Sequence, residues 1–206
     1  MAITFYDLCG RDAKRFSPYG WRTRMALAHK GLGYDLELVK FTDKDKLAFS
    51  GQPLVPVIVD GDTVVNDSWA IAEYLEDSYP DRPSLFGSAE GRGMAKAINA
   101  FVNTTIQPLV FPLIVADVLD QVDPADHGSK VEGLRRALEP YRVVVGDRPF
   151  VGGDGPTYAD YVLFGTLQWA RCTSAYGLVT VDDPIHSWFE RMLDLHDGLG
   201  RNEPAA

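Results

Sequence analysis

Residues 53–75 read PLVPVIVDGDTVVNDSWAIAEYL, and this stretch decides the fold class. The run 55–59 is mostly β-branched and apolar, which is typical of a buried strand. The Gly-Asp pair at 61–62 predicts a tight turn into a second strand at 63–65. A helix is expected over 67–78, because the Asp and Ser at its start are strong capping residues. The stretch therefore predicts an antiparallel hairpin followed by a helix.

The residues before this stretch alternate between strand and helix patterns. We expect strands at 3–6 and 34–39, a helix over 18–30 between them, and a short irregular helix at 43–49. A helix that connects two strands in this way is typical of a parallel pair. Together with the hairpin, these elements predict a thioredoxin-like α/β domain.

The second half of the chain predicts helices, with a possible strand only at 143–145. Proline and glycine are frequent over 79–91, which indicates a linker. We therefore expect a thioredoxin-like domain over 1–80, a linker at 81–91 and an all-helical domain over 92–206. The helices are expected at 93–121, with interruptions at Pro108 and Pro112, and at 130–145, 157–176 and 184–196.

Composition narrows the classes of partner. The 206 residues carry a formal net charge of -9, which disfavours nucleic acids and anionic membranes. The two cysteines, Cys9 and Cys172, form neither a disulfide framework nor a metal-binding spacing, so we expect no metal and a cytoplasmic location. No secretory signal is visible, and no apolar stretch reaches the length of about 18 residues that indicates a membrane span.

Ser17, followed by Pro18, stands where the first helix should begin. Ser before Pro is the usual pattern of a helix cap, and on local sequence this interpretation is the simpler one. The same geometry also suits an anion, because a helix N-terminus presents free N–H groups and a positive dipole. A hydroxyl at this place can donate a hydrogen bond to a thiolate.

Two further motifs point to a ligand that resembles a peptide. Pro56 at the start of an interior strand predicts a cis bond after Val55, whose backbone could then pair with an extended peptide. Asp67 and Ser68 open a helix whose N-terminus could bind an amino-acid end, the ammonium at Asp67 and the carboxylate at Ser68. The alternatives are an edge-strand proline and ordinary caps. Taken in order, the three motifs describe a thiol, a peptide backbone and an amino-acid end, which are the parts of glutathione.

These motifs resemble the glutathione transferase family. The strings FSPYGWRTR from Phe16, VPVIV from Val55, DSWAIAEYL from Asp67 and YPDRP from Tyr79 are similar to those of serine-type bacterial and fungal members. The resemblance is closest to bacterial β-etherases, which cleave lignin-derived aryl ethers with glutathione. The resemblance implies a thioredoxin-like domain, a helical domain, glutathione as co-substrate and a homodimer.

The resemblance also implies roles for individual residues. Ser17 takes the position of the serine that activates the thiol. Glutathione would be held by Ser17, Leu54, Val55, Pro56, Asp67 and Ser68. The string GPTYAD from Gly155 resembles the family's capping box, in which Thr157 and Asp160 have a folding role.

A pocket for a small hydrophobic electrophile is expected between the two domains. Candidate lining residues are Tyr19, Phe101, Thr104, Thr105, Phe111, Tyr161 and Trp169, although each could instead belong to the helical core. Before Ser17, the loop carries Arg11, Lys14 and Arg15, which are either solvated or a clamp for the glycine carboxylate of glutathione. Tyr6 is a rival hydroxyl that we assign to the strand core.

Three functions remain open on sequence alone. The first is transfer of glutathione to a hydrophobic electrophile. The second is glutathione-dependent cleavage of a β-aryl ether by the same thiolate, and the third is binding of glutathione or a hydrophobic ligand without catalysis. Because Cys9 does not occupy the serine position, we do not expect a mixed-disulfide mechanism.

Overall fold

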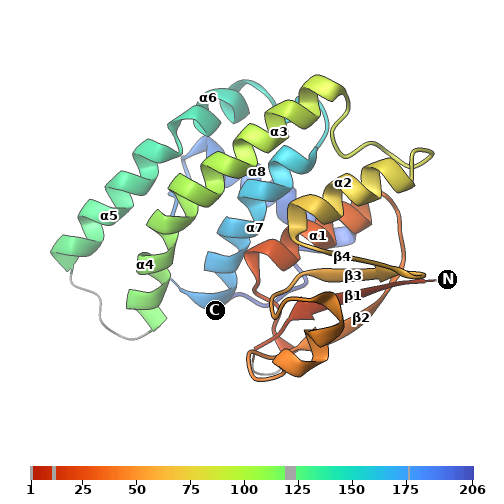
Figure 1. The fold of residues 1–206 in the computed structure, drawn as a ribbon. Coiled ribbons are helices and arrows are strands. Elements are labelled where there is room, and N and C mark those ends of the chain that lie inside the picture. The colour runs from red at the N-terminus through yellow and green to blue at the C-terminus, as the bar shows by residue number, and fades with distance from the viewer. Residues whose placement is uncertain (1, 11–12, 119–123, 176) are drawn as a thin grey trace.

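The computed structural model describes residues 2–10, 13–118, 124–175 and 177–206. Its N-terminal part is a four-stranded sheet in the order β2-β1-β3-β4 (Figure 1). Strands β1 (Ile3–Leu8) and β2 (Tyr34–Val39) are parallel, whereas β3 (Val57–Asp60) runs antiparallel to β1 and to β4 (Thr63–Asn66). The thioredoxin-like domain that the sequence predicts is confirmed.

The two faces of the sheet pack against different elements. On one face, helices α1 (Pro18–His29) and α2 (Ser68–Ser78) share the main core with Phe5. On the other face, Tyr6 joins a smaller cluster that is closed by the 3₁₀ helix η2 (Lys44–Ser50). Phe5 and Tyr6 point to opposite faces because side chains alternate along a strand.

The rest of the described chain is helical, as expected. Residues 79–88 connect α2 to the helical domain. Its elements are α3 (Ala89–Phe101), the π-helical turn η3 (Val102–Ile106), α4 (Gln107–Val118), α5 (Pro124–Ala137), α6 (Glu139–Asp147), α7 (Tyr158–Thr173) and α8 (Pro184–Gly198). The combined fold, an α/β domain followed by a helical domain, is the one that the sequence predicts.

Prolines divide the helical domain differently from the prediction. The expected interruption near Pro108 takes the form of η3, in which the N–H of Gln107 bonds to the C=O of Val102. The single helix expected over 130–145 is wrong, because α5 and α6 are separated at Leu138. Pro140 explains the break, since it lacks the N–H that a continuous helix would need there. The possible strand at 143–145 is also wrong, because these residues lie in α6.

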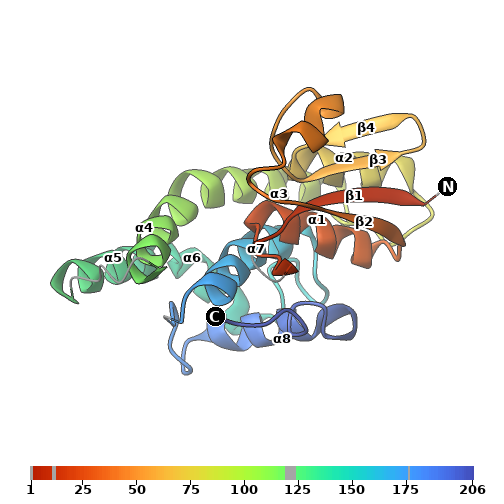
Figure 2. The same ribbon diagram turned by 90° about the horizontal axis from the view of Figure 1, so that it is seen from below.

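Helix α7 is the centre of the helical domain and packs against α1 (Figure 2). A Cβ atom added to Gly165 of α7 would lie 2.3 Å from the carbonyl oxygen of Pro18 and 3.1 Å from Cγ of Arg22. The lack of a side chain at Gly165 therefore lets α7 approach the first turn of α1 closely.

Asp160 fixes the start of α7. The expected capping box between Thr157 and Asp160 is present, and the buried Asp160 carboxylate accepts the backbone N–H of Thr157 at 2.9 Å. It also accepts N–H groups from Val151 at 2.7 Å, Gly152 at 3.1 Å and the Trp188 indole at 2.9 Å. Burial raises the pKa of Asp160, and these four hydrogen bonds oppose that rise. Asp160 thus connects α7, α8 and the preceding loop.

The helical run Ala89–Val115 is long and apolar enough, by length and composition, to cross a membrane. Core helices of soluble proteins pass the same test. Here α3 packs against α7, and α4 packs against α5 and α7. These contacts leave most of the run unburied, since 28% of its apolar window lies inside the structure.

We predict that Gly165→Ala lowers the free energy of unfolding by about 1–3 kcal/mol, because the added methyl group overlaps α1. Urea unfolding followed by circular dichroism measures this change. Gly93→Ala is the matched control, since nothing lies within 4 Å of its added Cβ and Ala is the better helix former. Equal stability of the two variants would contradict the close approach of α1 and α7.

Candidate functional site

Ser17 caps helix α1 and is nearly buried. Its Oγ accepts the backbone N–H of Gly20 at 3.0 Å, and Pro18 follows as the first helical residue. Among the described residues, no acceptor takes the hydroxyl proton of Ser17. The cap expected from sequence is therefore present, and the hydroxyl keeps its donor for a ligand.

Ser17 lines a cavity of about 410 Å³ between the two domains, which we call the Ser17 cavity. Most of its lining is apolar or aromatic. Tyr19, Phe111 and Trp169, three of the residues proposed for the electrophile, lie here, and the rings of Phe111 and Trp169 are 6.0 Å apart. The cavity therefore places an apolar surface beside the Ser17 hydroxyl.

A second cavity of about 360 Å³, the Asp67 cavity, is more polar. Pro56 and Asp67 line it, together with Gln52, Asn66 and Asn103. Tyr19, Leu54 and Val55 line both cavities, so the two spaces adjoin. A ligand could therefore extend from Ser17 past Val55 to Asp67.

Val55 offers backbone hydrogen-bonding groups to such a ligand. The Val55–Pro56 peptide bond is cis, as expected, and β3 begins only at Val57. Among the described residues, the N–H and C=O of Val55 have no partner. Those of Leu54 are both taken by the Gln52 side chain, at 2.8 Å and 2.6 Å.

Asp67 and Ser68 begin α2 in different ways. The Asp67 carboxylate is exposed and accepts the backbone N–H groups of Trp69 at 2.9 Å and Ala70 at 3.1 Å. Its φ of 74° is uncommon for a residue with a side chain. Ser68 is buried, and its carbonyl accepts the hydroxyl of Tyr158 at 2.6 Å. Only Asp67 of this pair lines the Asp67 cavity.

Four residues proposed for the electrophile pocket line neither cavity. Phe101 stacks on Tyr141 beside a separate apolar pocket between α3 and α6. The hydroxyl of Thr104 donates to the carbonyl of Ala100 at 2.8 Å, and Thr105 belongs to the same π-helical turn. Tyr161 is buried, with its hydroxyl between two histidines. Of these four side chains, Tyr161 is buried, Phe101 and Thr105 are half-buried and Thr104 is exposed.

Lys40 and Gln107 are lining residues that the sequence analysis missed. Lys40 follows β2 and is the charged residue of the Ser17 cavity. Gln107 begins α4, and its Oε1 is buried without a partner among the described residues. Lys40 directly follows a predicted strand, and this position could have marked it as a candidate lining residue. Gln107 belongs to no sequence motif. The direction of its side chain depends on the π-helical turn before it, which the sequence did not predict.

The basic loop before Ser17 points away from both cavities where it is described. Arg15 pairs with Glu203 at 2.9 Å, and Lys14 donates to the carbonyl of Ala205 at 3.0 Å. Arg11 lies outside the described residues. Lys14 and Arg15 therefore bind segment 203–205 of this protein and line neither cavity.

A buried carboxylate lies directly behind the first turn of α1. A Cβ on Gly20 would come within 1.9 Å of Oδ1 of Asp7, so only glycine fits there. Burial raises the pKa of Asp7, and Arg24, at 2.5 Å from Oδ2, offsets part of that rise. Arg24 also balances the negative charge of Asp7 behind this turn.

Neither cysteine has the features of a reactive thiol. Cys9 and Cys172 are free and buried. Burial raises the pKa of the Cys172 thiol to about 11, which keeps it protonated at neutral pH.

Comparison with known proteins identifies the family. The family model described as "Glutathione S-transferase, N-terminal domain" matches residues 16–78, and "Glutathione S-transferase, C-terminal domain" matches residues 115–191. The chain belongs to the glutathione S-transferase family. In this glutathione S-transferase, Ser17 lies at the interface between the two domains.

Relatives of this glutathione S-transferase include plant proteins. It is 29% identical to the rice (Oryza sativa subsp. japonica) "Probable glutathione S-transferase GSTU6" over 74% of this chain and 68% of the rice protein. It is 39% identical to "Glutathione S-transferase Z2" of Arabidopsis thaliana over 42% of this chain and 41% of that protein. The second match thus spans about two fifths of its relative.

Solved structures agree with the fold. Poplar glutathione transferase F1 superposes with a TM-score of 0.77 at 20% identity, covering 98% of this chain and 96% of the poplar chain. Glutathione transferase GSTFuA3 from Phanerochaete chrysosporium superposes with a TM-score of 0.72 at 26% identity, covering 98% and 94%. At these identities, the likeness to the poplar protein concerns the fold alone.

The histidines beside Tyr161 join the two domains and predict a pH dependence. His29 of α1 lies 2.6 Å from the Tyr161 hydroxyl, and His196 of α8 lies 3.3 Å from it. Burial lowers the pKa of both imidazoles, while Lys30 and Glu76 add smaller effects of opposite sign at His29. Between the lowered values and the ordinary pKa of about 6.5, the unfolded chain binds more protons. The free energy of unfolding contributed by His29 and His196 is therefore lost as the pH falls below about 6.5.

We predict that His29→Gln reduces the loss of unfolding free energy between about pH 7 and about pH 5.5. Urea unfolding at several pH values measures the slope. His186→Gln is the control, because His186 lies near the other end of α8. An unchanged slope in His29→Gln would show that this cluster does not carry the pH dependence.

Proposed function

We propose that this family member is a serine-type glutathione transferase in which Ser17 activates the thiol of glutathione. The observation that carries the proposal is the Ser17 hydroxyl at the N-terminus of α1, with its donor free and facing a cavity between the domains. Glutathione would extend from there past Val55 to Asp67. The apolar part of the Ser17 cavity would hold a hydrophobic electrophile.

The energies are sufficient for thiol activation. A thiol of pKa about 8.5 is little ionised at neutral pH, and lowering that value by two units needs about 2.7 kcal/mol. A hydrogen bond from Ser17 to a thiolate contributes about 1.5–3 kcal/mol, and the dipole of α1 adds about 0.3–1 kcal/mol. Ser17 acts as a donor and removes no proton, so the thiol proton leaves to solvent.

The chemical step follows from this arrangement. The thiolate sulfur forms a bond to an electrophilic carbon, and the electron pair of the broken bond leaves with the departing group or moves into the acceptor. Phe111 and Trp169 offer flat apolar surfaces to the electrophile. Cleavage of a β-aryl ether is the same attack with an aryloxide as leaving group. The relatives named here are transferases, which favours transfer over ether cleavage and over binding without catalysis.

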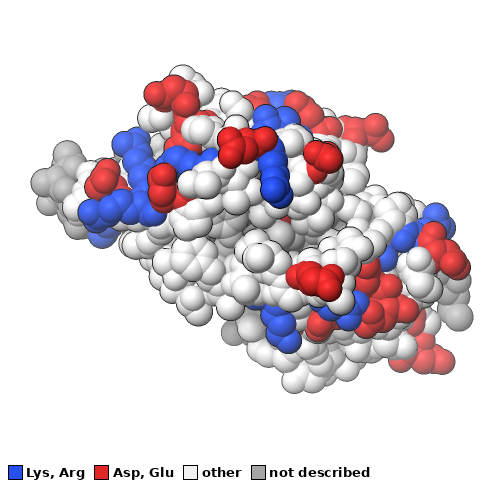
Figure 3. All heavy atoms as spheres, turned by 90° about the horizontal axis from the view of Figure 1, so that it is seen from above, with Lys and Arg blue, Asp and Glu red and all other residues white. Residues whose placement is uncertain are grey.

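The surface charge agrees with a small-molecule substrate. On the face drawn in Figure 3, acidic and basic side chains lie among one another and form no basic patch. Mixed charge of this kind gives nucleic acid no continuous basic surface on this face. We also propose that the protein is a homodimer and cytoplasmic. Light scattering of the purified protein tests whether it is a homodimer.

We predict that Ser17→Ala lowers kcat/KM about 10- to 150-fold, which corresponds to the loss of about 1.5–3 kcal/mol. The ultraviolet absorbance of bound glutathione thiolate at neutral pH should fall, while glutathione affinity changes little. Conjugation of a chromogenic electrophile measures the rate, and release of a phenol from a β-aryl ether tests the alternative reaction.

Ser88→Ala is the matched control for this experiment. Ser88 caps α3 through an Oγ that accepts the N–H of Gly91 at 3.1 Å, so the control loses a helix cap in the same way. Thiolate absorbance that is unchanged in Ser17→Ala would refute the assignment of Ser17. Tight glutathione binding by the unmodified protein, without turnover of any electrophile, would favour a binding protein.

Lys40 is proposed to pair with the glycine carboxylate of glutathione, because it is the charged residue of the Ser17 cavity. We predict that Lys40→Met raises KM for glutathione up to about fivefold and leaves kcat nearly unchanged, since an exposed ion pair contributes about 0–1 kcal/mol. Lys46→Met is the control on the neighbouring 3₁₀ helix. A change in kcat without a change in KM would contradict this role.

A further inference from the structure

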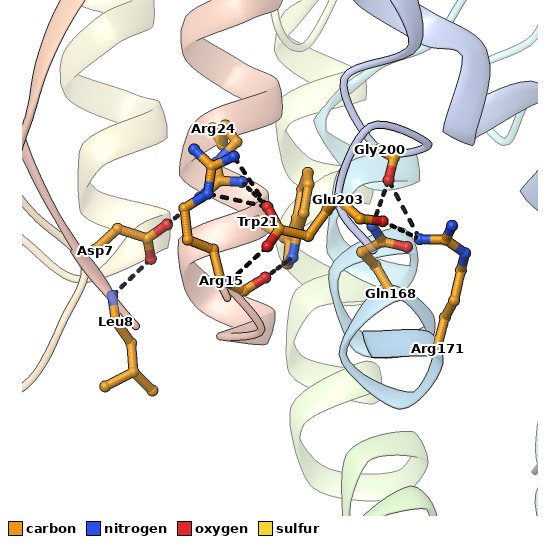
Figure 4. A network of polar contacts seen from close by, with 9 residues as sticks. All are labelled: Asp7, Leu8, Arg15, Trp21, Arg24, Gln168, Arg171, Gly200 and Glu203. Atoms are coloured by element: carbon orange, nitrogen blue, oxygen red, sulfur yellow. Dashed lines mark hydrogen bonds and ion pairs between the residues drawn. The ribbon is translucent and has the colours of Figure 1, made fainter. Parts of the chain in front are cut away.

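Segment 203–206 lies against the loop that leads into Ser17, although almost the whole sequence separates them (Figure 4). The Glu203 carboxylate accepts the backbone N–H of Arg15 at 2.8 Å and its Nε at 3.0 Å. The same guanidinium reaches Oε2 through Nη2 at 2.9 Å. Lys14 adds a bond from its Nζ to the carbonyl of Ala205 at 3.0 Å. One side chain, Glu203, therefore holds both the backbone and the side chain of Arg15.

The loop that Glu203 holds is connected to α1 on its other side. The carbonyl of Arg15 accepts the indole N–H of Trp21 at 3.0 Å, and Trp21 is buried one turn into α1. The N–H of Gly10 donates to the carbonyl of Lys14 at 2.8 Å, which closes the loop on itself. Ser17 follows Arg15 by two residues. The position of Arg15 therefore restricts where Ser17 can lie.

Glu203 is itself fixed from the helical domain. The guanidinium of Arg171 on α7 donates to the carbonyl of Glu203 at 2.9 Å. Gln168, one turn earlier on α7, donates to the carbonyl of Gly200 at 2.8 Å. Figure 4 shows these two bonds reaching Gly200 and Glu203 from the side of α7. The segment thus links α7 to the loop before Ser17.

The carboxylate at this link is buried, whereas its partner Arg15 is partly exposed. Glu203 is 3% exposed and Arg24 is fully buried. Arg24 lies 3.5 Å from Oε2 of Glu203 and 2.5 Å from Asp7, with its guanidinium over the Trp21 ring. Buried ion pairs contribute little net stability compared with apolar packing of the same volume. What the Glu203 carboxylate does here is hold the backbone and the side chain of Arg15 in one arrangement.

We propose that Glu203 is a positioning residue for thiol activation, which it supports by holding Arg15 and thereby the Ser17 hydroxyl in place. This inference rests on the proposed role of Ser17. Glu203 touches neither cavity, so its effect is transmitted through the loop. Loss of the link should disturb the hydrogen bond to the thiolate more than the binding of glutathione along Val55 and Asp67.

The test uses Glu203→Gln in the full chain, which keeps the size of the side chain and removes its charge. We expect kcat to fall about tenfold, within the range for a misplaced catalytic group, with KM for glutathione unchanged within about twofold. The absorbance of bound thiolate should fall in parallel. Hydrogen exchange of the amides over 13–17, measured by mass spectrometry, should become faster.

Two further variants make the result decisive. Glu190→Gln is the matched control, because Glu190 pairs at 2.9 Å with Arg201 on the surface of the same part of the fold. Arg15→Gln removes the partner of Glu203 while keeping the backbone bond, and it is partly exposed, so it tests the link if Glu203→Gln fails to fold. If the link acts as a unit, the double variant should lose no more activity than Glu203→Gln alone.

The outcomes separate this inference from the proposed function. Wild-type kcat and thiolate absorbance in Glu203→Gln or Arg15→Gln would overturn the positioning role, even if the exchange of 13–17 became faster. Additive losses in the double variant would also overturn it. Full thiolate formation in Ser17→Ala would instead refute the proposed role of Ser17, and that measurement does not involve Glu203.

Discussion

The first turn of α1 is the place on which the rest of the structure depends. Ser17 caps it, Gly20 lies directly against the buried Asp7 carboxylate, and the carbonyl of Pro18 meets Gly165 of α7. The sheet thus restricts one side of this turn and the helical domain restricts the other. Both contacts need glycine, because a Cβ would overlap the neighbouring atoms. Ser17, Pro18 and Tyr19 of this same turn line the cavity between the domains.

The carboxylates around that turn are each paired with an arginine. Asp7 and Glu203 bring two negative charges close to α1, and Arg24 and Arg15 bring two positive ones. If glutathione binds as proposed, carboxylates without these arginines would raise the pKa of its thiol. The two carboxylates and the two arginines are thus matched in number around this turn. Structural ion pairs and the chemistry of the site are thus connected through electrostatics as well as through geometry.

Local patterns predicted the fold well because its decisive signals are local. The turn at 61–62, the caps at Ser17 and Asp67 and the proline after Val55 each specify backbone geometry within a few residues. The break at Leu138 was missed because a helical pattern of apolar residues continues across it. The partnership of Arg15 with Glu203 could not be predicted, since it joins residues 188 positions apart. The same holds for Gln107, whose direction depends on a π-helical turn, and for Tyr161, which faces two histidines from other helices.

The backbone of Asp67 gives an independent reason to expect a ligand at that end of the groove. A φ of 74° suits glycine, and a residue with a side chain costs about 1–3 kcal/mol in such a region. Part of this cost is offset because the carboxylate caps α2 through the N–H groups of Trp69 and Ala70. A cap at a relaxed φ would achieve that without strain, as Ser88 does for α3 with an extended backbone. In its strained conformation, Asp67 is exposed and lines the cavity that Val55 and Pro56 also line. Strain of this kind is typical of binding sites, and it supports the proposal that Asp67 binds the ammonium end of glutathione.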